Sequence, residues 1–365
     1  MAAKSTSAFC QRVLPNGGFL LCRARMDQFQ TSPGPETRSQ YMLGMSAFST
    51  PVLLIAFNRP DHTRRVIEAI RRVRPVELFV FQDGARNQGD EDRCMEARSV
   101  IREMVDWPCQ LHTFFSAHNL GCGPGPVAAI GWFFNHVEKG IILEDDVVPH
   151  PDFFGYASFL LEKYGEDESV MAIGSMKLGN DVYGDGSYYF SKMNHTLCAW
   201  ATWKGAWERF DYTLSDFSVK ELDGCLKSYG ACLREREYWC ERLEEIHKDR
   251  LGDSSWDQQF WMSIWRYGGK GILPNVNLCS NIGFDRNATH TTDASNPAAN
   301  NKTERILPMT APSSEEIQKK ADDYFQRHYF QPWAYGWKGI KNLPFRINRR
   351  IKKWMGHEGP WFKMK

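Results

Sequence analysis

Short runs with strand character alternate with segments of helical spacing between residues 51 and 175. The runs lie at 52–57, 78–81, 110–115, 141–143 and 170–175. The segments of helical spacing lie between them, at 61–73, 88–105, 125–138 and 151–164. Such runs are typical of buried strands, and their alternation with helices predicts parallel strands joined by helical crossovers. We therefore predict an α/β fold, with a Rossmann-type, mostly parallel sheet flanked by helices.

Three acidic residues, Glu144, Asp145 and Asp146, directly follow the apolar run 140–143. Ligands of open α/β sheets bind at the carboxyl ends of the strands, and clustered carboxylates there favour Mg²⁺ or Mn²⁺. The alternative is an acidic helix start in which Asp146 caps the helix that follows. We favour the metal site, because a buried strand rarely ends in three carboxylates.

Polar residues also follow the first three predicted strands. Arg59 has the forked guanidinium that suits a phosphate, although an ordinary surface arginine is the alternative. Asp83 could bind a base or a ribose, or it could cap the next helix. Asn119 opens the glycine-rich segment 119–125, which suits an anion at a helix start. Because this segment lacks both GxGxxG and a Gly-Lys-Ser/Thr motif, a dinucleotide-binding oxidoreductase is disfavoured.

Three further features lie in the second half of the chain. Asp257 starts an aromatic helix predicted at 255–267, where it either complements the helix dipole or acts as a general base. His290 lies in the polar loop 285–312, so it is either structural or a ligand. Trp200 and Trp203, with Trp207, fit one helical face, which predicts core packing or a wall that stacks on a sugar.

The composition divides the chain into three parts. Residues 1–50 show no helical or strand period, which predicts disorder or a start codon placed too early, with Met45 as the alternative start. Residues 51–312 form the domain, with a nucleotide-binding half at 51–175 and an acceptor half at 176–312. Residues 313–365 form a helix and a basic tail, in which residues 338–365 hold nine Lys and Arg against Glu358. That tail is either a solvated helix or a segment that contacts an anionic membrane surface.

Composition also excludes several classes of protein. The net charge of +1 gives no global field that would attract nucleic acid. The ten cysteines contain no CxxC pair, so neither a zinc site nor a disulfide framework is expected. No stretch has the length of a membrane span. We therefore expect a cytoplasmic protein, associated at most with the inner face of the membrane.

These motifs together resemble the nucleotide-diphospho-sugar transferases of the type A glycosyltransferase (GT-A) fold. The resemblance spans about residues 51–295 and rests on the motifs PVLLIAFNRP, QDG, NLG and ILEDD, the last followed by PHPDFF. The sequence is most similar to the bacterial hemolytic-protein-like glycosyltransferase group, and more distantly similar to N-acetylglucosaminyltransferase I.

The resemblance implies a metal-dependent, inverting transfer of a hexosyl or N-acetylhexosaminyl group from a nucleotide sugar to a glycan or lipid-linked acceptor. It implies that Asp146 binds Mn²⁺ or Mg²⁺, with His290 as a further ligand, and that Asp257 is the catalytic base. Arg59 would contact the nucleotide or diphosphate of the donor, Asp83 its base or ribose, and Asn119 the nucleotide sugar. Glu144 and Asp145 would contact the ribose or sugar, or support the metal ligand from behind. Trp200 and Trp203 would lie on the acceptor side. A nucleotidyltransferase and a non-catalytic carbohydrate-binding protein are the alternatives.

Overall fold

The computed structural model describes residues 10–13, 19–22, 48–177, 179, 181–193, 196, 198–248, 256–284, 300–330 and 344. The first half contains β3 (Val52–Ala56), α2 (Pro60–Val73), β4 (Glu77–Gln82), α3 (Gln88–Met104), β5 (Gln110–Phe115), α4 (Pro124–Phe134), β6 (Lys139–Glu144), β7 (Val147–Pro149), α5 (Pro151–Lys163) and β8 (Val170–Gly174). The second half contains β9 (Tyr188–Ser191), β10 (Trp200–Trp203), α6 (Lys204–Trp207), α7 (Val219–Ser228), α8 (Leu233–His247), α9 (Asp257–Arg266), β11 (Lys270–Pro274), β12 (Cys279–Asn281), α10 (Lys319–Phe325) and the π-helical turn η3 (Gln326–Phe330).

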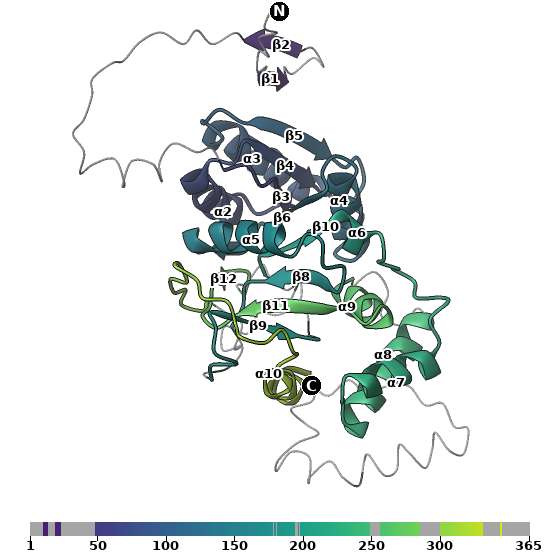
Figure 1. The fold of residues 1–365 in the computed structure, drawn as a ribbon. Helices are drawn as coiled ribbons and strands as arrows, with labels where there is room; N and C mark the ends of the chain where they lie inside the picture. Colours follow the sequence, from purple (N-terminus) through teal and green to yellow (C-terminus); the bar gives the residue numbers. More distant parts are fainter. Residues whose placement is uncertain are drawn as a thin grey trace, which may run out of the picture.

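An eight-stranded sheet forms the centre of the fold, in the order β5-β4-β3-β6-β10-β8-β11-β9 (Figure 1). Strands β5, β4, β3 and β6 are parallel neighbours, and β8 is parallel to β11. Strand β10 lies antiparallel between β6 and β8, and β9 is antiparallel to β11 at the edge. The predicted α/β class with a mostly parallel sheet is thus confirmed.

Side chains of the central strands alternate between the two faces of the sheet, as the pleat requires. In β3, Val52 and Leu54 join the hydrophobic cluster that includes residues of α2, α3 and α5. Leu53 and Ile55 join the cluster on the other face, with residues of α4, α6 and α9. Burial on both faces explains why β3 is apolar throughout.

A third hydrophobic cluster joins the second half of the chain to the sheet. It contains Trp239 of α8, Trp261 and Trp265 of α9, and Phe325 of α10, together with residues of β9 and β11. Helix α10 begins at Lys319, so the helix expected from residue 313 starts later than predicted. The rest of the basic tail, apart from residue 344, lies outside the described residues, so its membrane contact stays a prediction.

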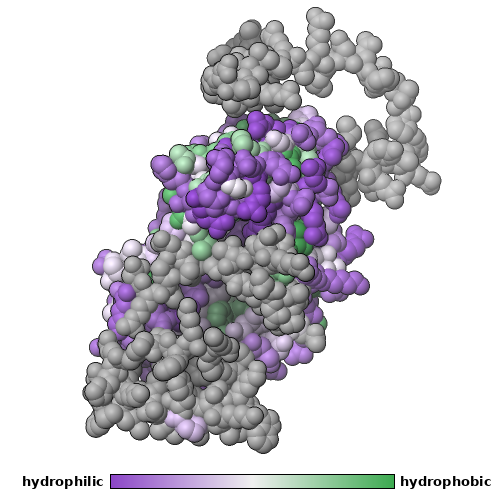
Figure 2. All heavy atoms as spheres, turned by 180° about the vertical axis from the view of Figure 1, so that it is seen from behind, coloured by the Kyte–Doolittle hydropathy of each residue, from purple (hydrophilic) through white to green (hydrophobic). Residues whose placement is uncertain are grey.

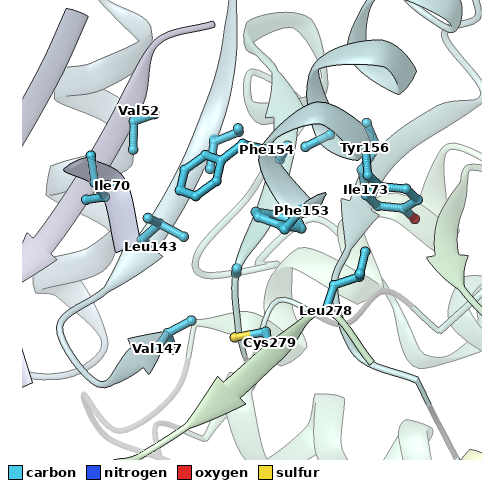
Figure 3. Close-up of a cluster of buried hydrophobic side chains, with 14 of the residues drawn as sticks. Val52, Ile70, Leu143, Val147, Phe153, Phe154, Tyr156, Ile173, Leu278 and Cys279 are labelled. Atoms are coloured by element: carbon cyan, nitrogen blue, oxygen red, sulfur yellow. The ribbon is translucent and has the colours of Figure 1, made fainter. Parts of the chain in front are cut away.

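Strands β7 and β12 form a small antiparallel pair beside the main sheet. Val147 and Cys279 belong to the same hydrophobic cluster as Phe153 and Phe154 of α5, and so does Leu278, which directly precedes β12 (Figure 3). This packing fixes the segment that directly follows the acidic triplet, together with a segment more than 130 residues further along the chain.

The N-terminal segment contains a short pair of strands. Within residues 1–50, β1 (Cys10–Val13) and β2 (Phe19–Cys22) form an antiparallel pair, which the sequence did not predict.

The described part of the face in Figure 2 is mostly hydrophilic, with scattered hydrophobic side chains. Among the described residues, no helix has the length and apolarity needed to cross a membrane.

Candidate functional site

The candidate site lies where the strand order reverses, between β3 and β6. These strands are parallel neighbours, and Ile55 pairs in register with Glu144. The chain following β3 therefore reaches the same edge of the sheet as the acidic triplet. Carboxyl ends of strands at such a switch point are where open α/β sheets bind ligands.

Arg59 connects the ends of the two strands through the acidic triplet. Its Nη2 lies 2.7 Å from Oδ1 of Asp145, and its Nη1 lies 3.0 Å from Oδ2 of Asp146. The other oxygen of Asp145 accepts a hydrogen bond of 2.9 Å from the backbone N–H of Phe57. Both oxygens of Asp145 are thus engaged, so this residue fixes β3 to β6.

Asp146 differs from Asp145 because one of its carboxylate oxygens lacks a hydrogen-bond partner among the described residues. Its Oδ2 pairs with Arg59, whereas its Oδ1 is buried and has no hydrogen-bond partner among the described residues. Leaving a buried polar atom unsatisfied costs roughly 1–3 kcal/mol, and more for a charged group. An oxygen in this condition is a candidate ligand for a cation.

The triplet carries more negative charge than Arg59 balances. Burial, followed by the charges of Asp146 and Asp145, raises the pKa of Glu144 to about 8. Burial also raises the pKa of Asp145, although Arg59 acts in the opposite direction. Burial would lower the pKa of Arg59, but the three carboxylates outweigh it and raise that pKa above its ordinary value. The local potential therefore favours a cation.

Asp83 lies at the end of β4, and its carboxylate binds the loop that follows β5. Oδ1 accepts hydrogen bonds of 2.8 Å from the backbone N–H groups of Gly84 and Leu120. Oδ2 accepts hydrogen bonds of 3.0 Å from Nδ2 of Asn119 and from the backbone N–H of Gly121. These four bonds occupy the acceptor capacity of a carboxylate. Asp83 therefore shapes the 118–121 loop, which argues against its expected direct contact with a base or ribose.

A glycine allows this loop to approach β4. A Cβ atom at Gly84 would lie 2.4 Å from the carbonyl carbon of His118, which is far inside any normal contact. Asn119 also donates a hydrogen bond of 2.8 Å from Nδ2 to the carbonyl of Gly84. The side-chain amide of Asn119 is thus held at the same edge of the sheet as the triplet.

Asp257 lies within electrostatic range of the triplet. It is the first residue of α9 and is half-buried. Its charge contributes to the raised pKa of Glu144 and to the raised pKa of Tyr238 in α8, which in both cases is due first to burial. The Asp257 carboxylate is thus near enough to Glu144 to affect its pKa, although the two residues are far apart in the sequence.

The two tryptophans expected on the acceptor side belong instead to strand β10, which corrects their assignment to one helical face. Trp200 is 1% exposed and packs with Trp256 and Phe260, at ring-centroid distances of 5.8 and 5.5 Å. Trp203 points to the other face and donates a hydrogen bond from Nε1 to the carbonyl of Leu161. A buried Trp200 cannot stack on a sugar, so the core-packing interpretation holds for this residue. His290 lies outside the described residues.

A buried charge network next to the site was not predicted from the sequence. Asp90 is fully buried, and its carboxylate accepts hydrogen bonds from Asn58, Arg86 and Arg93. These bonds and the charge of Arg86 lower the pKa of Asp90 despite its burial. The guanidinium of Arg86 lies 5.0 Å from the ring centroid of Phe57. The i to i+4 spacing of Arg86 and Asp90 was the available signal.

A divalent cation fits the chemistry of this site. The ligand atom on offer is a carboxylate oxygen, which Mg²⁺ and Mn²⁺ prefer. Within the described ranges, no three His, Cys, Asp or Glu side chains are arranged to hold a metal ion on their own. Mg²⁺ is commonly held by one or two carboxylates together with substrate phosphates, so a single protein oxygen agrees with a site shared with a diphosphate.

No protein-family model matches the chain. Its fold was also compared with solved structures, and glucosyl-3-phosphoglycerate synthase from Mycobacterium tuberculosis in complex with phosphoglyceric acid aligns at 15% identity and a TM-score of 0.28. That alignment covers 50% of this chain and 64% of the synthase, so the chain spans less than two thirds of its length. UDP-glucose pyrophosphorylase complexed with UDP-glucose aligns at 12% identity and a TM-score of 0.30, over 44% and 78% of the two chains.

The 4-diphosphocytidyl-2C-methyl-D-erythritol synthase from Anaerococcus prevotii DSM 20548 aligns at 10% identity and a TM-score of 0.29, over 50% and 85% of the two chains. All three similarities are distant. The α/β class therefore rests on the strand order and the helix positions of this chain itself.

Proposed function

We propose that this protein is a metal-dependent, inverting glycosyltransferase that uses a nucleoside-diphosphate sugar. The observation that carries the proposal is Oδ1 of Asp146, a buried carboxylate oxygen with no partner among the described residues at a topological switch point. The other oxygen of the same carboxylate, Oδ2, forms an ion pair with Arg59, so the carboxylate has a defined orientation. The resemblance of the sequence motifs to the GT-A group supports the same reaction.

Each residue at the edge of the sheet has a proposed role. Asp146 would hold Mn²⁺ or Mg²⁺, with His290 as a second ligand. When bound, the cation would neutralise the charge that develops on the nucleoside diphosphate leaving group. Arg59 orients the Asp146 carboxylate and would contact the diphosphate, while Asn119 and the loop shaped by Asp83 would contact the nucleoside.

Asp257 is the proposed general base. It would remove the proton of the acceptor hydroxyl, whose oxygen forms a bond to the anomeric carbon of the sugar. The bond between that carbon and the diphosphate oxygen breaks on the opposite side, so the configuration inverts. The proximity of Asp257 to Glu144 supports this role, because it lies near the proposed donor site.

The finer features of the reaction follow from the same resemblance. The transferred group would be a hexose or an N-acetylhexosamine, and the acceptor a glycan or a lipid-linked glycan. The basic tail would bring the enzyme to the inner face of a membrane, where such acceptors occur.

The test is a thermal-shift screen of UDP-, GDP-, dTDP- and CMP-sugars with Mn²⁺, because a ligand that binds the native state raises its apparent stability. The donor that binds is then assayed for Mn²⁺-dependent release of nucleoside diphosphate; release of CMP from a CMP-sugar would instead contradict a nucleoside-diphosphate donor. The proposal requires both signals in the wild type and the loss of both in Asp146→Ala. Release of pyrophosphate from a nucleoside triphosphate would instead identify a nucleotidyltransferase. Binding of glycans without any donor binding would identify a carbohydrate-binding protein.

A further inference from the structure

We propose that Gly283 positions the Asp146 carboxylate and thereby determines which of its oxygens is offered to a cation. This inference rests on the proposed function, because it treats Asp146 as the metal ligand. It concerns a residue to which the sequence motifs alone assign no role. Gly283 follows β12, and it lies 137 positions beyond Asp146 in the chain.

The backbone of Gly283 lies directly against the Asp146 side chain. A Cβ atom added to Gly283 would lie 2.1 Å from Oδ2, 2.8 Å from Cγ and 3.0 Å from Cβ of Asp146. Ordinary van der Waals contact begins at 3.4 Å. Any side chain at position 283 therefore forces the carboxylate or the backbone to move by about 1 Å.

The segment that carries Gly283 is anchored from several directions, so the backbone is poorly able to give way. Strand β12 pairs with β7 next to the triplet, and the N–H of Ile282 donates a hydrogen bond of 2.8 Å to the carbonyl of Asp146. Nε2 of His62 lies 3.1 Å from the carbonyl of Ile282. The N–H of Gly283 donates a hydrogen bond of 2.8 Å to Oδ1 of Asn281.

Arg59 and Gly283 together define the orientation of the carboxylate. Both contact Oδ2, one through an ion pair and the other by close packing. Oδ1 is left as the oxygen without a partner among the residues that the structure describes. The Asp146 carboxylate is thus built to present one oxygen, and a residue larger than glycine at position 283 would turn or displace it.

The first experiment measures Mn²⁺ affinity in the presence of UDP by electron paramagnetic resonance. Mutation of a residue that orients a metal ligand typically costs about 10–100-fold in metal affinity or activity. We therefore expect Gly283→Ala to weaken Mn²⁺ binding by at least about 10-fold. The matched control is Gly224→Ala in α7, where an added Cβ meets no atom within 4 Å. Unchanged Mn²⁺ affinity in Gly283→Ala, with circular dichroism like that of the wild type, would overturn the inference.

The second experiment is independent of metal and uses thermal unfolding of the wild type, Gly283→Ala, Asp146→Ala and the double variant. If the two residues are in contact as described, most of the loss in Tm caused by Gly283→Ala should disappear when Asp146 is already alanine. Equal losses in both backgrounds would show a general packing defect and overturn the inference. A wild type that binds no Mn²⁺ would overturn the proposed function and the ligand role, while coupling in this cycle would still establish the positioning contact.

Discussion

Removal of the Arg59 side chain tests the idea that the strand-end ion pairs hold the site together. In Arg59→Ala, two carboxylates lose their cation at once. The Asp145 and Asp146 side chains are 3% and 14% exposed, and that of Arg59 is 19% exposed. Removing one partner of a buried pair typically costs about 3–5 kcal/mol, whereas an exposed pair contributes about 0.2–1 kcal/mol.

Because Arg59 retains some contact with water, we expect a loss near the lower end of the buried range, about 3 kcal/mol in the free energy of unfolding. For a domain of this size, such a loss corresponds to a fall in Tm of about 4–6 °C. Urea unfolding at pH 7, followed by circular dichroism, measures the free energy directly.

The control for this prediction is Arg71→Ala in α2, the helix that Arg59 directly precedes. Arg71 pairs with Asp106, and their side chains are 45% and 46% exposed. Its loss should therefore cost less than about 1 kcal/mol. Arg59→Lys keeps the charge but loses the planar fork, so it should fall between the two. Equal losses for Arg59→Ala and Arg71→Ala would refute the argument, because the strand-end pairs would then behave as surface pairs.

Three further predictions concern single carboxylates. Asp83→Asn replaces one acceptor oxygen with an NH2 donor that faces other N–H donors, so we expect a loss of about 2–4 kcal/mol and faster amide hydrogen exchange at Leu120 and Gly121; unchanged exchange would contradict the loop-shaping role. Asp257→Asn should leave donor binding intact and lower turnover by ~10²–10⁴-fold, and near-normal turnover would place the base elsewhere. Burial raises the pKa of Asp322 to about 6, so the native state binds more protons than the unfolded state between about pH 4 and 6. The free energy of unfolding should therefore fall by about 3 kcal/mol across that window as the pH rises, and Asp322→Asn should remove this part of the slope; an unaltered slope in urea titrations would refute it.

The first half of the fold was predictable because its strands carry their signal locally. Strand β3 is buried on both faces, and a short apolar run next to a helical segment identifies it without knowledge of its partners. Strand β10 was not predictable in this way, because it is inserted antiparallel between β6 and β8, neither of which adjoins it in sequence. The spacing of Trp200 and Trp203 fits a helix, yet in a strand an odd separation places the two side chains on opposite faces. That is where the structure places them.

The candidate site was predictable to the level of the strand ends. Strand order alone brings Arg59 and the triplet to one edge of the sheet. The partners of Asp83 were not predictable, because the positions of the N–H groups of Leu120 and Gly121 depend on the conformation of a turn. The contact of Gly283 with Asp146 depends on the pairing of β12 with β7, which no local pattern in the sequence indicates.

The structure divides the strand-end carboxylates into those that build the site and one that remains available. A buried carboxylate is costly unless donors surround it. Asp83 obtains three donors from the loop after β5 and a fourth from the N–H of Gly84, and Asp145 obtains Arg59 and the N–H of Phe57, so both are satisfied by the protein itself. Oδ1 of Asp146 has no such donor among the described residues, although Oδ2 of the same carboxylate is fixed by Arg59. An acidic residue at a strand end is therefore weak evidence for a ligand by itself. The stronger criterion is a carboxylate whose orientation is fixed on one side and whose other oxygen the protein leaves unsatisfied, because a bound cation would then offset a cost that the fold otherwise retains.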